Sequence, residues 1–312
     1  MIGFNFGART SVRQTLTSTT HFKRTEVRIP EGLLLSIIYG IASSLSWGAG
    51  DFAGGLSSRK VGAYRAVLYA DFFGLLILIV VSLFYRESFP SGNVVFNSLI
   101  GGALGSFGLL ILYYSLSVGQ MSIAAPVSAL FAALLPVVYG AMTEGLPSMI
   151  QFIGFGLALA AVWLISQGDG GFHVSKLSDL KFPILAGVGF GCYFIFIHNA
   201  VGEPDSLLWP MIISRVAGTL LLFFIVLARR EAFAVPRDAW TVVLINATLD
   251  LGGNFFFILA SKAGRLDIAA ILSSLYPGAT VTLAWLILKE HISRVQVIGI
   301  ALAFAAIFLF TI

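Results

Sequence analysis

Long apolar segments separated by short polar connections make up almost the whole chain after residue 31. A segment of about 20 mostly apolar residues is long enough to cross the hydrocarbon core of a bilayer as a helix. The pattern predicts ten such helices, at 32–56, 64–84, 94–118, 121–142, 147–166, 182–202, 206–228, 239–261, 267–288 and 293–312. The fold class is therefore an all-α membrane protein with ten transmembrane helices, and the short connections make neighbouring helices antiparallel.

Composition supports a membrane environment and narrows the function. Hydrophobic residues account for 58% of the chain and charged residues for 11%, whereas soluble domains carry roughly a quarter charged residues. The net charge of +4 is distributed over the connections and the N-terminus, which is typical of loops beside membrane spans and does not indicate nucleic-acid binding. We expect a multi-pass protein of the plasma (inner) membrane. With Cys192 as the single cysteine, no disulfide can form within the chain.

The sequence does not indicate an enzyme. It contains neither H-E-x-x-H nor G-x-S-x-G, and its four histidines are far apart. We therefore expect no catalytic residues, no cofactor and no metal site.

The first 31 residues differ from the rest of the chain. They are rich in Ser, Thr and Arg, and they contain no acidic residue before Glu26. This composition is compatible with a disordered polar tail, which is the interpretation we favour, or with an organellar transit peptide.

The chain repeats itself at a spacing of 145 residues. "SIAAPVSAL" begins at Ser122 and "DIAAILSSL" begins at Asp267, and the likeness extends over most of both halves. We divide the chain into a first repeat at 32–166, a connecting loop at 167–181 and a second repeat at 182–312. Because five spans is an odd number, the second repeat enters the membrane from the opposite side. Inverted repeats of this kind are characteristic of transporters that expose a midplane site to either side in turn.

Two longer stretches carry a family resemblance. "YYSLSVGQMSIAAPVSALFAALLPVVYGAMTEGLPSMIQFIGFGLALA" and "FILASKAGRLDIAAILSSLYPGATVTLAWLILKEHISRVQVIGIALAFAAIFL" both resemble the EamA domain of the drug/metabolite transporter superfamily. The matching positions are Gly119, Gly264, Glu144, Glu290, Gly154, Gly299 and Pro277. The resemblance covers 32–312 and implies a ten-helix carrier of small organic metabolites, often an exporter, with a central cavity between the halves and cytoplasmic termini. One position departs from the family, because Asp71 stands where an Arg is common; Arg215 fits that pattern in the second repeat.

The strongest site candidates lie in the eighth predicted span. Asn246, Asp250 and Asn254 recur at four-residue steps and therefore share one helix face. A carboxylate at membrane depth is costly and indicates function by default. The equivalent face of the third span carries Gly101 and Gly105, which would leave room for a ligand opposite the polar stripe.

Other candidates come in pairs related by the repeat. Asp51, on one face with Trp47, is equivalent to His198, and Asp71 is equivalent to Arg215. We predict that Asp71 and Arg215 offset each other's charge. The alternative is that Asp51 and Asp71 lie near span ends and reach the membrane interface.

Small and helix-breaking residues complete the set of candidates. Pro277 removes a backbone donor from the ninth span, and the carbonyl it frees can coordinate a ligand or be satisfied by Ser273 and its neighbours. Glycines at four-residue steps, such as Gly187 and Gly191, are more often seams for close helix packing than ligand sites.

Together these observations favour a secondary transporter, an exporter of a small organic metabolite such as an amino acid or a related amphiphile, working by alternating access. The expected partners are the substrate, the lipid bilayer and protons as coupling ion, and a homodimer is left open. The alternative is a membrane structural or assembly subunit without transport activity.

Overall fold

The structure is a computed structural model that describes residues 31–85, 87–117, 121–165, 167, 180–202, 207–289 and 291–310. Residues 1–30 of the predicted tail, most of the predicted loop 167–181 and Gly119 lie outside the described residues. The described part consists of helices and their connections, with no strand.

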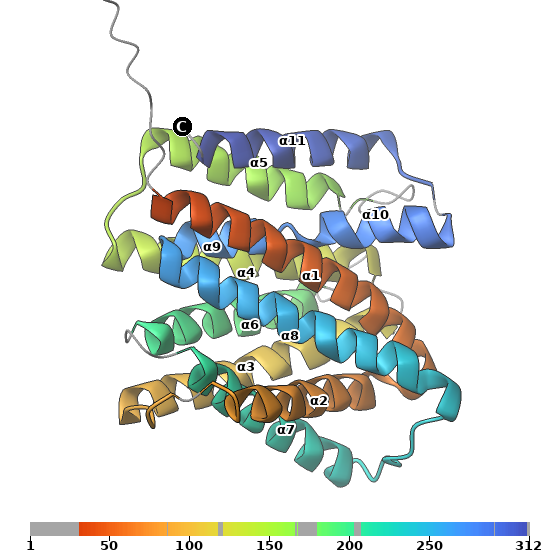
Figure 1. Cartoon of the computed structure of the whole chain (residues 1–312). Coiled ribbons are helices and arrows are strands. Elements are labelled where there is room, and N and C mark those ends of the chain that lie inside the picture. Colours follow the sequence, from red (N-terminus) through yellow and green to blue (C-terminus); the bar gives the residue numbers. More distant parts are fainter. Residues whose placement is uncertain are drawn as a thin grey trace, which may run out of the picture.

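In the described residues the first half of the chain forms five α-helices, and the second half forms six α-helices and one short 3-10 helix. The first half contains α1 (Glu31–Val61), α2 (Ala63–Ser82), α3 (Gly92–Ser117), α4 (Met121–Thr143) and α5 (Met149–Ile165). The second half contains α6 (Lys181–Val201), α7 (Leu208–Ala228), the short 3-10 helix η2 (Arg237–Ala239), α8 (Trp240–Ala263), α9 (Leu266–Ser273), α10 (Tyr276–Leu288) and α11 (Arg294–Phe310). These elements follow the predicted segments in order (Figure 1).

Seven segments are long and apolar enough to cross a membrane. They are Glu31–Val61, Ala63–Ser82, Gly92–Ser115, Lys181–Val201, Leu208–Ala228, Arg237–Ala263 and Leu266–Ile287. Shorter apolar helices, Val127–Thr143, Met149–Ile165 and Arg294–Phe310, stand where the fourth, fifth and tenth spans were predicted. The structure therefore supports a multi-pass membrane protein with seven candidate spans in its described part, and the number of ten spans stays a prediction.

Apolar side chains cover the outside of the bundle. Large hydrophobic residues such as Leu45, Val80, Phe224 and Phe304 leave more than half of their surface exposed. Apolar exposure on this scale matches lipid rather than water as the surrounding solvent, because a soluble surface rarely presents large contiguous apolar patches. In lipid, helices are the form in which each segment satisfies its own backbone groups.

The ninth predicted span is broken into two helices. α9 ends at Ser273, and α10 begins at Tyr276 with Pro277 in its first turn. Pro277 has no N–H to donate, and a proline is tolerated in the first turn of a helix but not in its interior. The two residues of the break still donate backbone hydrogen bonds to carbonyls of α9. The amide of Ser274 donates to the carbonyl of Ala270 at 2.9 Å, and the amide of Leu275 donates to that of Leu272 at 3.2 Å. The predicted effect of Pro277 is thus seen as a helix break.

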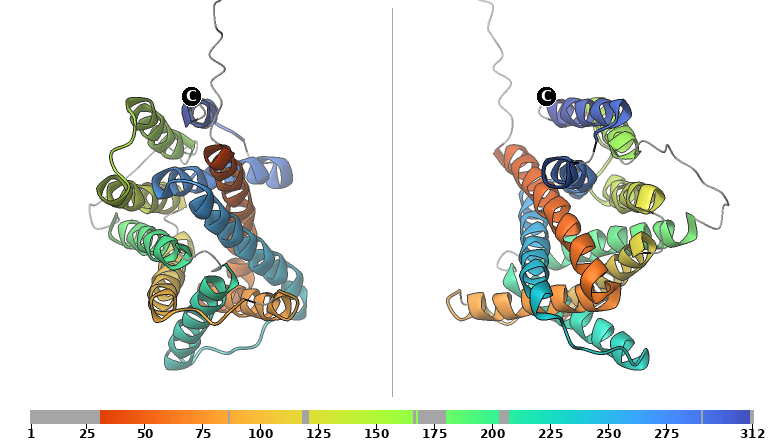
Figure 2. Two further views of the ribbon diagram at one scale, coloured as in Figure 1. Left: turned by 60° about the vertical axis from the view of Figure 1, so that its left-hand side comes forward. Right: turned by 90° about the vertical axis from the view of Figure 1, so that its right-hand side faces the viewer.

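Equivalent helices of the two halves pack in matching ways (Figures 1 and 2). α1 packs on α8, and its counterpart α6 packs on α3. Likewise α1 contacts α9 and α10 while α6 contacts α4, and α2 contacts α8 while α7 contacts α3. Three further pairings join counterparts directly: α2 with α7, α4 with α9, and α5 with α11. The two repeats are therefore interleaved around a shared interface.

Glycines permit the closest of these contacts. A Cβ built at Gly187 would lie 2.5 Å from the carbonyl oxygen of Ser128, and one at Gly191 would lie 2.9 Å from Leu135. Both contacts join α6 to α4. The interpretation of this glycine pattern as a helix-packing seam is confirmed.

Candidate functional site

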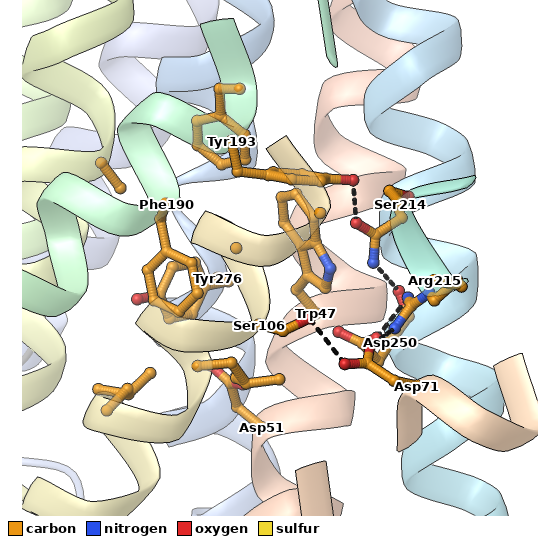
Figure 3. Close-up of a pocket in the computed structure, with 17 residues that line it drawn as sticks. Trp47, Asp51, Asp71, Ser106, Phe190, Tyr193, Ser214, Arg215, Asp250 and Tyr276 are labelled. Carbon is orange, nitrogen blue, oxygen red and sulfur yellow. Dashed lines mark hydrogen bonds and ion pairs between the residues drawn. The ribbon is translucent and has the colours of Figure 1, made fainter. Parts of the chain in front are cut away.

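A cavity lies between the two halves, near the middle of the helices that line it (Figure 3). It has a volume of about 80 Å³ open to water-sized molecules. Helices α1–α4 contribute Trp47, Asp51, Asp71, Gly102, Gly105, Ser106, Leu109, Leu112 and Ala132. Helices α6–α8 and α10 contribute Phe190, Tyr193, Phe194, Ser214, Arg215, Asp250, Asn254 and Tyr276. Because both repeats line this cavity, movement of one half against the other would change its shape.

One arginine joins two carboxylates at the edge of the cavity. Arg215 Nη1 lies 2.5 Å from Asp71 Oδ1, and Nη2 lies 2.5 Å from Asp250 Oδ2. The side chains of Arg215, Asp71 and Asp250 are 7%, 4% and 14% exposed. Ser106 donates from its hydroxyl to the other oxygen of Asp71 at 2.6 Å. This network links α2, α3, α7 and α8, and it sets one guanidinium between two carboxyl groups, so that each buried acid has a basic partner.

The network extends across the cavity toward α6. The amide nitrogen of Asn254 donates to the carbonyl of Asp250 at 2.6 Å, and the hydroxyl of Tyr193 donates to the amide oxygen of Asn254. Tyr193, on α6, therefore joins the network to the opposite wall of the cavity (Figure 3). A connected hydrogen-bond network of this kind holds its side chains in one arrangement around the cavity.

Aromatic rings form the remaining wall. Trp47 stacks on Phe194 with ring centroids 5.5 Å apart, and Phe194 stacks on Phe257 at 4.4 Å. Glycines make room for two of the rings. A Cβ at Gly253 would lie 2.3 Å from the Trp47 ring, and a Cβ at Gly105 would lie 2.9 Å from the Tyr193 ring. The aromatic wall thus depends on glycine, which has no side chain, at position 253 of α8 and position 105 of α3.

Seven of the predicted site residues line this cavity. They are Trp47, Asp51, Asp71, Gly105, Arg215, Asp250 and Asn254. Asp51 and Asp71, for which a position at the membrane interface was the alternative, both line the cavity between the repeats. The predicted pairing of Asp71 with Arg215 is seen directly.

The other five candidates lie elsewhere. Gly101 packs against Phe196 and Ile197, and Asn246 is fully buried beside Tyr113. Ser273 is buried at the end of α9, and Pro277 begins α10 behind the cavity wall formed by Tyr276. Gly101, Asn246 and Pro277 share helices with cavity residues, whereas Ser273 lies in α9, from which the cavity lining has no residue. All four are buried in the packing between helices.

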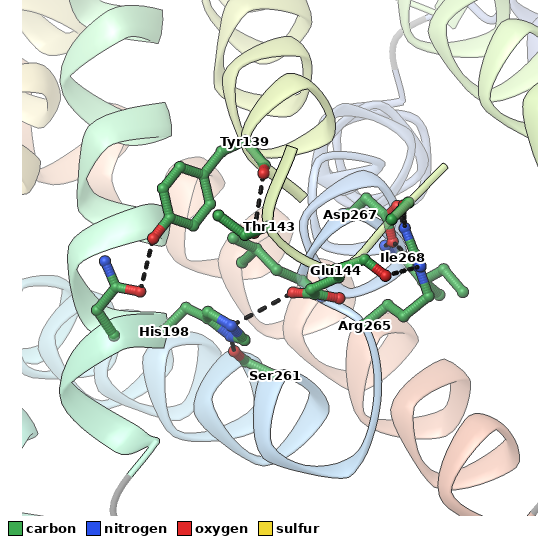
Figure 4. A network of polar contacts seen from close by, with 11 residues as sticks. Tyr139, Thr143, Glu144, His198, Ser261, Arg265, Asp267 and Ile268 are labelled. Carbon is green, nitrogen blue, oxygen red and sulfur yellow. Dashed lines mark hydrogen bonds and ion pairs between the residues drawn. The ribbon is translucent and has the colours of Figure 1, made fainter. Parts of the chain in front are cut away.

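His198 belongs to a second polar cluster (Figure 4). Its Nδ1 lies 2.7 Å from the Ser261 hydroxyl, and its Nε2 lies 3.4 Å from Glu144 Oε1. Arg265 donates to the backbone carbonyl of Glu144 at 3.2 Å and pairs with Asp267 at 2.7 Å. Burial raises the pKa of Glu144, although the Leu266 amide opposes this effect. The cluster connects the end of α4 to the turn between α8 and α9, so it joins the two repeats at one end of the bundle.

Sequence reasoning missed several cavity residues. Tyr193, Ser106 and Ser214 all line the cavity, yet a Tyr or Ser in an apolar helix carries no signal distinct from packing.

Among the residues that the structure describes, no three His, Cys, Asp or Glu side chains are grouped so that they could hold a metal ion. The polar chemistry at the cavity is therefore that of the Arg215 network and Asp51.

An apolar multi-helix bundle of two similar halves, with a charged and aromatic cavity between them, has the architecture of a transporter-like membrane protein. The sequence matches the EamA-like transporter family over residues 34–167 and 180–312. Because these two matches span most of the chain, the protein belongs to this family. The family membership agrees with the resemblance seen in the repeat sequences.

Individual relatives are more distant. The chain is 32% identical over 124 residues to the uncharacterized protein MJ1333.1 of Methanocaldococcus jannaschii, covering 40% of this chain and 88% of that one. It is 23% identical over 214 residues to the uncharacterized transporter sll1319 of Synechocystis, covering 67% of this chain and 64% of that one. A crystal structure with 16% identity superposes with a TM-score of 0.73 over 88% of this chain and 96% of the other, which shows a shared fold.

Proposed function

We propose that this protein is a secondary carrier that moves a small organic solute across a membrane by alternating access of the cavity between its two inverted repeats. The class of solute that we propose is a small metabolite such as an amino acid or a related amphiphile. The carrier is an exporter of the plasma membrane with cytoplasmic termini, as the family resemblance implies.

The observation that carries this proposal is the Arg215 network at the cavity between the repeats. A charged group inside a membrane is costly to maintain and, where it faces a cavity, marks a solute pathway. The groups around it come from both halves, so a relative movement of the halves would open the cavity to one side and then to the other.

Contacts between the halves at both ends of the bundle support such a movement. At one end Arg265 donates to the carbonyls of Glu144 and Gly145. At the other end, beside η2, Lys60 pairs with Asp238 at 2.8 Å and Arg65 donates to the carbonyl of Ala234 at 2.9 Å. Polar contacts of this kind can break and re-form at low cost, because exposed ion pairs contribute little to stability.

Protons are the coupling ion that we propose, with Asp250 as the exchanging carboxyl. The groups around it are Arg215 and Asn254, together with the ionisable side chains of Asp51, Asp71 and Tyr193. A carboxyl held by one shared arginine can release that partner when it accepts a proton, which would loosen the contact between α7 and α8.

The access of the cavity tests the carrier without knowledge of the substrate. In a Cys192→Ser background, Ser214→Cys places a thiol in the cavity wall with almost no change of shape. A membrane-impermeant maleimide is applied to oriented proteoliposomes from the outside alone, and in a second sample from the lumen alone. A carrier that alternates is labelled from each side, whereas a structural subunit with a closed or one-sided cavity is not.

Ser98→Cys is the matched control, because Ser98 is fully buried in α3 and its hydroxyl bonds to the carbonyl of Val94 in its own helix. It should resist labelling from both sides. Labelling of Ser214→Cys from one side only, under all solute and pH conditions, would contradict alternating access.

A further inference from the structure

We propose that the cavity selects organic cations, with Asp51 as the counter-charge and the Trp47–Phe194 wall as the surface for the apolar part of the solute. This inference rests on the proposed carrier function and narrows the substrate class of that same cavity from amino acids and related amphiphiles to amphiphiles that carry a net positive charge.

The first support is the charge of the cavity wall. Its acidic and basic lining residues are three carboxyl groups, Asp51, Asp71 and Asp250, and one guanidinium, Arg215. Asp71 and Asp250 share Arg215 between them. Asp51 has no ion pair within 4.0 Å in the described part of the chain. Beside it, α1 and α8 pack closely, since a Cβ at Gly50 would lie 3.3 Å from the Asp250 amide nitrogen. A positively charged solute would supply the missing counter-charge.

The second support is that Arg215 is not available for an anion. Both of its terminal nitrogens already lie 2.5 Å from carboxylate oxygens. Its Nε faces Gly74, where an added Cβ would lie 3.4 Å away, and so points toward α2 and not into the cavity. Recognition of a solute carboxylate normally uses an arginine with both terminal nitrogens free for a bidentate contact. This arrangement therefore disfavours anions.

The third support is the aromatic wall. Trp47 and Phe194 are stacked, both line the cavity, and Tyr193 and Tyr276 border the same space. An ammonium group placed over the face of an aromatic ring is attracted by the ring quadrupole, most strongly at Trp and when water is excluded. The rings would also cover an apolar substituent. A carboxylate beside aromatic faces fits an amine that carries an aromatic or aliphatic group.

A series of four compounds that share one phenyl ring and differ in charge provides the test. They are 2-phenylethylamine, phenylalanine, 3-phenylpropionate and 2-phenylethanol, which at neutral pH are a cation, a zwitterion, an anion and a neutral solute. Equilibrium binding of each radiolabelled compound to the purified full-length protein in detergent is measured by scintillation proximity. We expect the cation to bind at least about tenfold more tightly than each of the others, since only the cation offers an ammonium group to Asp51 without also bringing a carboxylate that Arg215 is not free to pair with.

Variants locate the counter-charge. Asp51→Asn should lower the affinity for 2-phenylethylamine by about tenfold or more, and Asp51→Glu should retain most of it. Asp238→Asn is the matched control, because it removes an exposed carboxylate that pairs with Lys60 outside the cavity. If Asp51→Asn does not fold, the wild-type compound series still decides the charge class.

Each other outcome overturns the inference in a recognisable way. Tighter binding of phenylalanine or 3-phenylpropionate would assign the cavity to another substrate class while leaving the carrier proposal in place. Binding of none of the four compounds would also overturn the inference, and the Ser214→Cys labelling would decide separately whether the protein is a carrier. Unchanged affinity in Asp51→Asn would remove Asp51 from recognition.

Discussion

Asp71 and Arg215 occupy equivalent positions of the two repeats, 144 residues apart, and form an ion pair with 2.5 Å between Oδ1 and Nη1. The pair lies between α2 and α7, which are themselves counterparts. Arg215 also pairs with Asp250 at 2.5 Å. The three residues therefore form one unit in which Arg215 has two ion-pair partners and each aspartate has one.

The sharing of Arg215 predicts unequal effects of neutralising its members. Arg215→Gln leaves two buried carboxylates without a counter-charge, whereas Asp71→Asn leaves Arg215 paired with Asp250. Removing one partner of a buried pair typically costs about 3–5 kcal/mol. We expect Arg215→Gln to lower the melting temperature in detergent more than Asp71→Asn does, and the double variant to recover part of the loss. Melting is followed by fluorescence on monodisperse protein.

Arg229→Gln is the control for this series, because Arg229 lies in an exposed connection, where it contacts Glu231 at 3.5 Å and the Tyr64 ring at 4.5 Å and pairs with no buried charge. The free energy of unfolding of this variant should stay within about 0.5 kcal/mol of the wild-type value. Strictly additive losses for the Asp71 and Arg215 variants would show that the two side chains do not interact.

Asp250→Asn should separate folding from transport. The amide keeps the size of the side chain, the backbone carbonyl of residue 250 still accepts from Asn254, and Arg215 keeps Asp71 as its partner. The variant should therefore express, insert and melt near the wild type yet lose solute transport or its dependence on pH. Transport by proteoliposomes across pH 5 to 8 and a melting curve are measured on the same preparation. Normal transport across that range would remove Asp250 from the mechanism.

The fit of Trp47 against Gly253 predicts a large effect of one methyl group. In Gly253→Ala the new Cβ would lie 2.3 Å from the indole ring, so the ring or the helix must shift. Overpacking of this kind costs about 1–3 kcal/mol. The melting temperature should fall, and the cavity should lose its binding capacity because the aromatic wall moves.

Gly156→Ala in α5 is the matched control, since no atom lies within 4 Å of a Cβ added there. It should be neutral or slightly stabilising, because alanine is the better helix former by about 1 kcal/mol. An equal loss in both variants would show that the helix backbone, and not Trp47, is responsible.

Arg265 at the turn between α8 and α9 predicts a further difference. It pairs with Asp267, which is fully buried, and that carboxylate holds the pKa of Arg265 above its usual value. Arg265→Ala should destabilise the protein by about 1–3 kcal/mol by leaving Asp267 uncompensated, less than for a fully buried pair because Arg265 is 26% exposed. The double variant Arg265→Ala/Asp267→Asn should recover part of this loss in the same melting assay. A loss in Arg265→Ala no greater than that of an exposed arginine would contradict the structural importance of the pair.

Sequence patterns predicted the helices and the equivalence of Asp71 with Arg215, because both follow from spacing along one chain. They did not predict that Asp250 joins this pair, since the pattern does not state which helices of opposite halves pack together. Asn246 and Asp250 share a helix stripe, yet one turn of α8 is enough to carry Asn246 from the cavity into the contact with Tyr113. Tyr193 was missed because a hydroxyl on an aromatic ring looks like packing until its acceptor, Asn254, is known.

The opposite charges at positions 71 and 215 have a consequence for the evolutionary history of the fold. Two identical copies of a single repeat, related by a two-fold axis, would place like charges at these equivalent positions, where they would repel. Joining the copies in one chain allows each to mutate on its own, so one can carry the acid and the other the base. The ion pair therefore records a division of labour that only a fused, diverged duplication, or a pair of distinct subunits, could acquire.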